Sequence, residues 1–184
     1  MGVRRHLDAL TAEGLVTGAR REQHRVGRPP AGWRLTSAGL ELFPRRYDML
    51  ALELIEDVAA AGPDAVDELF ARRTTRLAAE YEKELDGARG LDERLEGIAR
   101  IRDDEGYEAS CTRAEKGTFV LTEANCAVHH VAERCPAVCA HEHDLLQVLL
   151  GPGVEVTRTS HILNGDPTCS YRVRVAARTP AAPA

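Results

Sequence analysis

The sequence has no hydrophobic stretch long enough to cross a membrane. A transmembrane helix needs roughly 18 or more consecutive apolar residues, and no run among these 184 residues approaches that length. The first residues, MGVRRH, also lack the apolar segment of a secretory signal. These absences predict a cytoplasmic protein with no membrane partner.

Motifs that mark common enzyme sites are missing too. We find no glycine-rich phosphate loop, no nucleophile elbow and no evident pair of acid and base. The chain still has material for a folded core, because 43% of its residues are hydrophobic and its 29% charged residues are of both signs. We therefore expect a globular binding protein that is not an enzyme.

Lysine is scarce, since Lys83 and Lys116 are the only two, and arginine supplies almost all the positive charge. Residues 1–46 contain nine arginines and four acidic residues, a net charge of +5, whereas the whole chain carries −5 and the remainder therefore −10. This split predicts an anion-binding N-terminal segment on an acidic body, although a solvated basic face gives the same count.

The basic segment has the pattern of a helix followed by a hairpin. Val3, Leu7 and Leu10 repeat at helical spacing, and two short strand patterns at 15–20 and 31–35 flank a polar loop. A winged helix addresses DNA with such a helix and loop. The candidate DNA-binding residues are Arg4, Arg5 and His6 on the helix and Arg25 and Arg28 in the wing. The alternative is an ordinary solvated basic hairpin.

The predicted fold class is α+β, with three parts and a tail. Residues 1–46 form a partial winged helix-turn-helix, which we expect to be truncated because the two helices that usually precede the recognition helix are missing. We expect residues 47–104 to form a helical linker and dimerisation region. In it, Leu50, Leu54 and Val58 lie on one stripe of a helix. Residues 105–176 form an α+β sensor domain with an antiparallel sheet, and residues 177–184 a disordered tail.

The third part alternates strands and short helices. Strand patterns occupy about 107–113 and 118–122, and a helix is expected from Cys126 to Arg134 behind an Asn125 cap. A second helix opens at Pro136 and ends near residue 150. In the last strand, alternation places four residues on one face: Cys169, Tyr171, Val173 and Val175.

Three of the five cysteines are candidate metal ligands. The number is odd, and disulfides are rare in a reducing compartment. Cys126, Cys139 and Cys169 fall at the starts of two helices and on the inner face of the last strand, from which they could converge. Thiolates are the ligands of iron-sulfur clusters, and helix N-termini favour thiolate over thiol. The alternative is three buried cysteines that act as small hydrophobic residues.

Short motifs in the first and last thirds of the chain are typical of one family. They are Val3–Leu10, Glu13–Val16, Gly27–Pro29, Trp33–Thr36, Asn125–Cys126, Cys139, Leu149–Gly151, His161–Ile162, Gly165–Asp166, Cys169 and Tyr171. Together they resemble the SufR family of iron-sulfur cluster-binding winged-helix repressors, which belongs with DeoR/ArsR-like helix-turn-helix regulators.

This resemblance implies a function and a cofactor. The expected protein is a homodimer that binds double-stranded operator DNA and represses genes of iron-sulfur cluster assembly according to cluster, redox or iron status. The cofactor expected is an iron-sulfur cluster, 4Fe-4S in preference to 2Fe-2S, on Cys126, Cys139 and Cys169.

Two cysteines depart from the family pattern and leave alternatives open. Cys111 is expected on a strand as a core residue, and Cys135 precedes Cys139 by four residues. Cys135 and Cys139 could bind zinc together with nearby histidines, namely His129, His130, His141 or His143. The rival functions are therefore a zinc-stabilised or a small-molecule-sensing winged-helix regulator.

Overall fold

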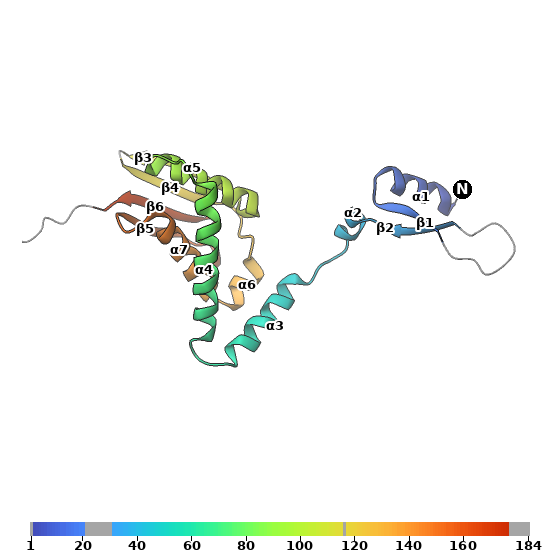
Figure 1. Ribbon diagram of the computed structural model, residues 1–184, viewed down its shortest axis with the longest axis horizontal. Coiled ribbons are helices and arrows are strands. Elements are labelled where there is room, and N and C mark those ends of the chain that lie inside the picture. The colour runs from blue at the N-terminus through green and yellow to red at the C-terminus, as the bar shows by residue number, and fades with distance from the viewer. Residues whose placement is uncertain (1, 21–30, 116, 177–184) are drawn as a thin grey trace, which may run out of the picture. The chain divides into compact units, whose positions relative to one another are not determined.

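The computed structural model describes residues 2–20, 31–115 and 117–176 of the chain. Two compact units are present, Met1–Arg46 and Tyr47–Ala184 (Figure 1). Each contains helices and antiparallel strands. The predicted α+β class is therefore confirmed.

The first unit is a helix followed by a hairpin and a short helix. Its elements are α1 (Val3–Ala12), β1 (Val16–Arg20), β2 (Ala31–Leu35) and α2 (Ser37–Glu41). Thr36 caps α2, because its hydroxyl accepts a hydrogen bond from the Gly39 amide at 3.1 Å. A side chain at Gly39 would collide with the carbonyl oxygen of Leu15. The glycine thus allows α2 to pack against the segment before β1.

The residues expected to contact DNA are only partly described. Arg4, Arg5 and His6 are exposed on α1, a helix in which no residue is buried. Arg25 and Arg28 lie outside the described residues. A winged helix-turn-helix is not identified in this unit.

The second unit combines five helices of the described chain with a four-stranded sheet. The helices are α3 (Tyr47–Ala59), α4 (Ala65–Glu84), α5 (Leu91–Arg102), α6 (His129–Arg134) and α7 (Ala137–Leu150). The strands are β3 (Ala109–Glu115), β4 (Thr118–Glu123), β5 (Val154–Ser160) and β6 (Cys169–Val175). A π-helical turn, Asp103–Tyr107, follows α5, and a 3₁₀ turn, Ile162–Asn164, precedes β6.

The sheet is antiparallel throughout, with strand order β3-β4-β6-β5. In the central pair, Leu121 lies opposite Tyr171 and Glu123 opposite Cys169. The predicted face of β6 is confirmed for Cys169, Tyr171 and Val173, which are buried, while Val175 at the strand end is exposed.

One core joins the helices to this sheet face. It contains residues from α4, α5 and α7 together with β4, β5 and β6, among them Tyr81, Leu95, Leu121, Leu145 and Val173. Figure 1 shows α5 beside β3 and β4, and the long helix α4 beside α7. Helices from the range 47–104 and strands from the range 105–176 therefore share a single core.

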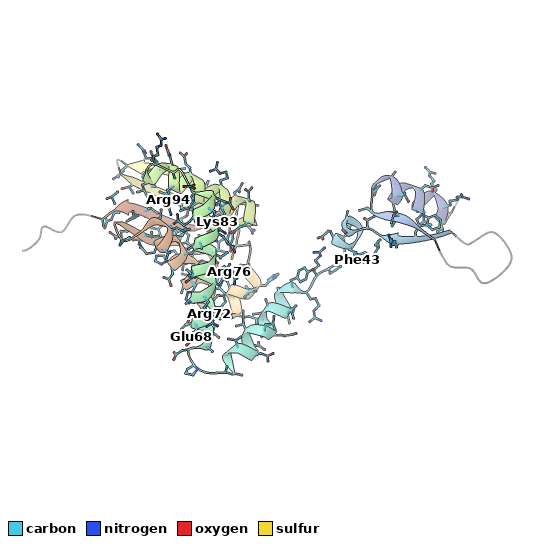
Figure 2. The ribbon with its side chains drawn as sticks, in the orientation of Figure 1. Phe43, Glu68, Arg72, Arg76, Lys83 and Arg94 are labelled. Carbon is cyan, nitrogen blue, oxygen red and sulfur yellow. The ribbon has the colours of Figure 1, made fainter. Side chains whose placement is uncertain are left out.

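Helix α3 leaves two leucines of its stripe exposed. Leu50 and Leu54 are 52% and 55% exposed, and Leu52 is the buried residue of the helix. The helix packs against α6 and α4, where Ile55 joins a second apolar cluster. Leu50 and Leu54 of the predicted stripe thus lie largely in solvent within this unit. Figure 2 shows charged side chains along the neighbouring helix α4, with Glu68, Arg72, Arg76 and Lys83 labelled.

Helices in the described ranges are too short or too polar to cross a lipid bilayer.

Candidate functional site

The three cysteines predicted to act together line one small cavity. Cys126 lies in the loop after β4, Cys139 in the first turn of α7, and Cys169 is the first residue of β6. The cavity has a volume of about 20 Å³, which is room for roughly one water molecule. Segments far apart in the sequence thus bring three thiols to one place.

Local structure explains this convergence. The register of the sheet places Cys169 opposite Glu123, the last residue of β4, and Cys126 follows three residues later. Pro136 caps α7, which puts Cys139 in the first turn. Sheet register and one helix start therefore position all three thiols.

The helix after β4 begins later than we predicted. Helix α6 starts at His129, and Cys126 lies in the loop before it. Asn125 does not cap a helix, because its side-chain amide donates to the carbonyl oxygen of Gly106 at 2.6 Å. This bond fixes the loop to the turn that precedes β3.

A buried charge network forms one wall of the cavity. Arg102 is 2% exposed and donates from Nε to Glu123 Oε1 at 2.8 Å and from Nη1 to Glu142 Oε2 at 2.5 Å. Glu142 accepts a further bond from Arg73 at 2.8 Å. The Arg102 guanidinium also stacks on the Tyr107 ring, 3.5 Å from its centre. The positive charges of two arginines and the negative charges of two glutamates thereby compensate one another.

The two carboxyl groups of this network differ in pKa. Burial raises the pKa of Glu123 above its usual value, against the opposing effect of Arg102. At Glu142, burial also acts to raise the pKa, but Arg102 and Arg73 outweigh it and hold the pKa below the usual value. The second arginine explains why Glu142 is the more acidic of the two.

The three thiols have raised pKa values. Burial is the largest cause at Cys126, Cys139 and Cys169, and it outweighs the backbone hydrogen bonds and the charge of Arg158 that act to lower these pKa values. Backbone amides do favour the thiolates of Cys126 and Cys169, but burial outweighs them and the net shift of the pKa is upward. Without a bound cation the cavity is lined by neutral thiols.

Arg158 on β5 forms another part of the wall. Its Nη2 donates to the carbonyl oxygen of Cys139 and lies 3.4 Å from the Tyr171 hydroxyl. His161 also lines the cavity, and burial together with the charge of Arg158 lowers the pKa of its imidazole. Positive charge therefore reaches the thiols from the β5 side.

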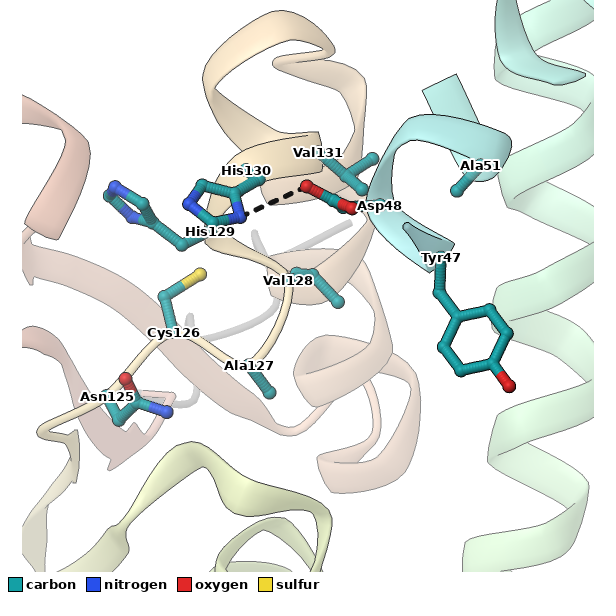
Figure 3. A pocket seen from close by; sticks show the side chains of 10 residues that line it. All are labelled: Tyr47, Asp48, Ala51, Asn125, Cys126, Ala127, Val128, His129, His130 and Val131. Carbon is teal, nitrogen blue, oxygen red and sulfur yellow. Dashed lines mark ion pairs between the residues drawn. The ribbon is translucent and has the colours of Figure 1, made fainter. Parts of the chain in front are cut away.

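Cys126 also borders an open pocket. This pocket has a volume of about 400 Å³ and lies between the start of α3 and the loop that leads into α6 (Figure 3). His130 Nδ1 lies 3.3 Å from Asp48 Oδ2 at its rim. Cys126 is therefore shared by the open pocket and by the small cavity that the other two thiols line.

The remaining cysteines are placed elsewhere. Cys111 lies half-buried on β3 beside the main core, as predicted. Cys135 is buried in the second apolar cluster with Phe70, Ala132 and Val138.

The histidines of the zinc alternative are dispersed. His129 lies near Glu133, His141 stacks on Phe70, and His143 contacts the carbonyl oxygen of Val156. Over residues 2–20, 31–115 and 117–176, no three His, Cys, Asp or Glu side chains are close enough to hold one metal ion.

Three residues of the site were missed by sequence reasoning. Arg102 and Glu123 occupy core positions of α5 and β4, in phase with Leu95 and Leu121. A charged residue in phase with a core face is a signal that could have found both. For Arg158 the sequence holds no comparable signal.

Comparisons with known proteins give a structural match and no sequence match. No family model matches the chain, and no curated protein matches it. Among solved structures, one that matches is the crystal structure of a trafficking protein particle complex subunit 3 from Naegleria fowleri, covalently bound to palmitic acid. The two share 18% identity with a TM-score of 0.45, over 71% of this chain and 91% of that chain. The palmitic acid and the complex belong to that protein.

The comparisons do not support the resemblance to the SufR family. The matched structure is a trafficking-particle subunit, and no family model supports a winged-helix regulator. The predictions of a repressor, of operator DNA as a partner, of a DNA-binding homodimer and of the alternative winged-helix regulators are therefore corrected. The motifs behind them are a few residues long, and stretches that short recur in unrelated proteins.

Proposed function

We propose that the second unit binds an iron-sulfur cluster through Cys126, Cys139 and Cys169. The observation that carries this proposal is the convergence of three thiols, from a loop, a helix start and a strand, on one cavity. Cysteine thiolates are the usual protein ligands of such clusters. When bound, the cluster supplies a centre for one-electron transfer.

The residues around the cavity fit an anionic, sulfur-rich group. Arg158 brings positive charge beside Cys139 and Cys169, and its Nε is buried with no hydrogen-bond partner in the described part of the chain. Of the three cysteines, only Cys169 is fixed by a strand. The lining therefore combines three thiols with an arginine, and because a cluster is larger than the present cavity of about 20 Å³, binding requires the loop that carries Cys126 to shift.

The donor set favours a cluster over zinc. Three cysteine thiols line the cavity, and cysteine thiolates are the usual ligands of iron-sulfur clusters. The histidines of the zinc alternative lie near other partners.

We also propose that the site binds and does not catalyse. A catalytic cysteine works as the thiolate and therefore needs a lowered pKa. Burial raises the pKa of all three thiols instead. Metal binding itself favours loss of the thiol proton, whereas a nucleophile with a raised pKa is less reactive at neutral pH because less of it is thiolate.

The test is anaerobic purification followed by iron and sulfide analysis and an absorption spectrum. We expect iron and sulfide in the wild-type protein, and their loss in Cys126→Ser, Cys139→Ser and Cys169→Ser. Cys111→Ser is the matched control, since Cys111 is half-buried but lies on β3, away from the cavity. A colourless wild-type protein that contains zinc would overturn the proposal, as would equal loss of iron in the Cys111 variant.

A further inference from the structure

Arg158 has a buried donor that the rest of the described chain leaves unused. Its Nε is shielded from solvent and, over residues 2–20, 31–115 and 117–176, has no hydrogen-bond partner. The same guanidinium bonds the carbonyl oxygen of Cys139 through Nη2, and it lies 5.3 Å from the centre of the Tyr171 ring. Orphaned buried donors are costly and rare in folded proteins.

The charge of Arg158 is also unpaired in the described residues. Arg102 and Arg73 share the carboxylates of Glu123 and Glu142, so that part of the wall is balanced. Arg158 makes no ion pair with a carboxylate in the described residues, and Glu123, the carboxylate that interacts with it electrostatically, is already bonded to Arg102. Arg102 also lies 3.7 Å from Glu105, so three arginines and three glutamates surround the cavity, but among these arginines Arg158 alone has no ion pair with a carboxylate in the described residues.

The positive charge of Arg158 lies beside the thiols. Arg158 lines the cavity together with Cys126, Cys139 and Cys169, and it acts electrostatically on the last two. An anion placed among the three sulfurs would be attracted by the charge of this guanidinium. A cluster with thiolate ligands is such an anion.

We infer that Arg158 neutralises the charge of the bound cluster and thereby sets how readily the cluster accepts an electron. The inference rests on the proposed function and adds a positioning and electrostatic residue that is not a ligand. Reduction adds negative charge beside the guanidinium, so Arg158 stabilises the reduced form. Charge and hydrogen bonds near the sulfurs are known determinants of cluster potential.

The test compares three substitutions at position 158 with one control. Arg158→Gln and Arg158→Met remove the charge, whereas Arg158→Lys keeps it. Arg172→Gln is the control, because Arg172 is an exposed arginine of the adjacent strand β6. Each protein is reconstituted anaerobically, its iron and sulfide are measured, and its reduction is followed by absorption during a potentiometric titration.

We expect the Gln and Met variants to require about a tenfold higher ratio of reduced to oxidised mediator for half-reduction, a fall of about 59 mV for one electron. Arg158→Lys and Arg172→Gln should stay within about threefold of the wild type. Failure of the Gln and Met variants to keep iron while the Lys variant keeps it also supports the inference.

Three outcomes would overturn the inference about Arg158. Unchanged potentials in iron-loaded Gln and Met variants would exclude the charge effect and leave the proposed function intact. Loss of iron or an equal fall in potential in the Lys variant as well would assign Arg158 a purely structural role. Wild-type protein that takes up no iron would remove the proposed function and this inference together.

Discussion

Arg102 Nε lies 2.8 Å from Glu123 Oε1, inside a unit whose core is otherwise almost wholly apolar. The two residues are 21 positions apart, on α5 and β4, and together they connect the helical layer to the sheet beneath the cysteines. A buried ion pair contributes little net stability when intact, but its disruption leaves an uncompensated charge.

Arg102→Met should therefore be strongly destabilising. It leaves the carboxylates of Glu123 and Glu142 without their shared partner, and we expect a loss of about 3–5 kcal/mol in the free energy of unfolding. The control is Arg174→Met, which breaks the exposed pair of Arg174 and Glu155 and should cost about 1 kcal/mol or less. Urea unfolding monitored by circular dichroism measures both, and similar losses would contradict the prediction.

Glu142→Gln should change how stability depends on pH. Because the folded-state pKa of Glu142 is lowered, its charge stabilises the native state above the ordinary glutamate pKa, and this stabilisation is lost as pH falls through the lower folded-state pKa. The stability difference between wild type and variant should be largest near pH 7 and shrink below about pH 4. Denaturant unfolding at pH 7, 5, 4 and 3 measures it, and a difference independent of pH would refute the argument.

Alkylation of the thiols should be slow at neutral pH and ordered. Burial raises the pKa of Cys126, Cys139 and Cys169, so little thiolate is present at pH 7 and the rate should rise with pH. Cys126 should react first, since it borders the open pocket of Figure 3. Peptide mapping by mass spectrometry after timed alkylation determines the order. Loading with iron and sulfide should protect these three and leave Cys111 unchanged.

Gly39→Ala should loosen the first unit. The added methyl group would collide with the Leu15 carbonyl oxygen, and overpacking of this kind costs about 1–3 kcal/mol. Gly18→Ala is the control, because a side chain there meets open space. Faster hydrogen exchange at the β1 amides in the Gly39 variant alone would confirm the close approach, and equal exchange in both variants would rule it out.

The sequence predicts those parts of the site that depend on local periodicity. Alternation along 169–175 places Cys169 and Tyr171 on a buried face, and the breaks at Pro136 and Gly151 bound the helix that carries Cys139. The expected elements allowed Cys126, Cys139 and Cys169 to converge, the family resemblance selected them over Cys111 and Cys135, and these three do line one cavity.

Features that depend on distant partners could not be predicted in this way. The start of α6 shifts to His129, and Asn125 bonds Gly106, 19 residues earlier. The buried face of α3, which includes Leu52, is set by contacts with α6 and α4, so the leucine stripe alone does not identify it. Likewise, Glu142 owes its pKa to Arg102 and Arg73, which lie 40 and 69 positions away.

The strand order of the sheet has a consequence for the time course of synthesis. Strand β6 is made after β5 yet lies between β4 and β5. Until β6 has emerged from the ribosome, β4 and β5 lack the strand that pairs with both, and these strand edges can pair with other chains. During that time the cavity contains Cys126 and Cys139 without Cys169. A cofactor that needs all three thiols can therefore bind only after β6 has been translated. A nascent chain stalled before residue 169 exposes the thiols of Cys126 and Cys139 and the edges of β4 and β5 that β6 would cover.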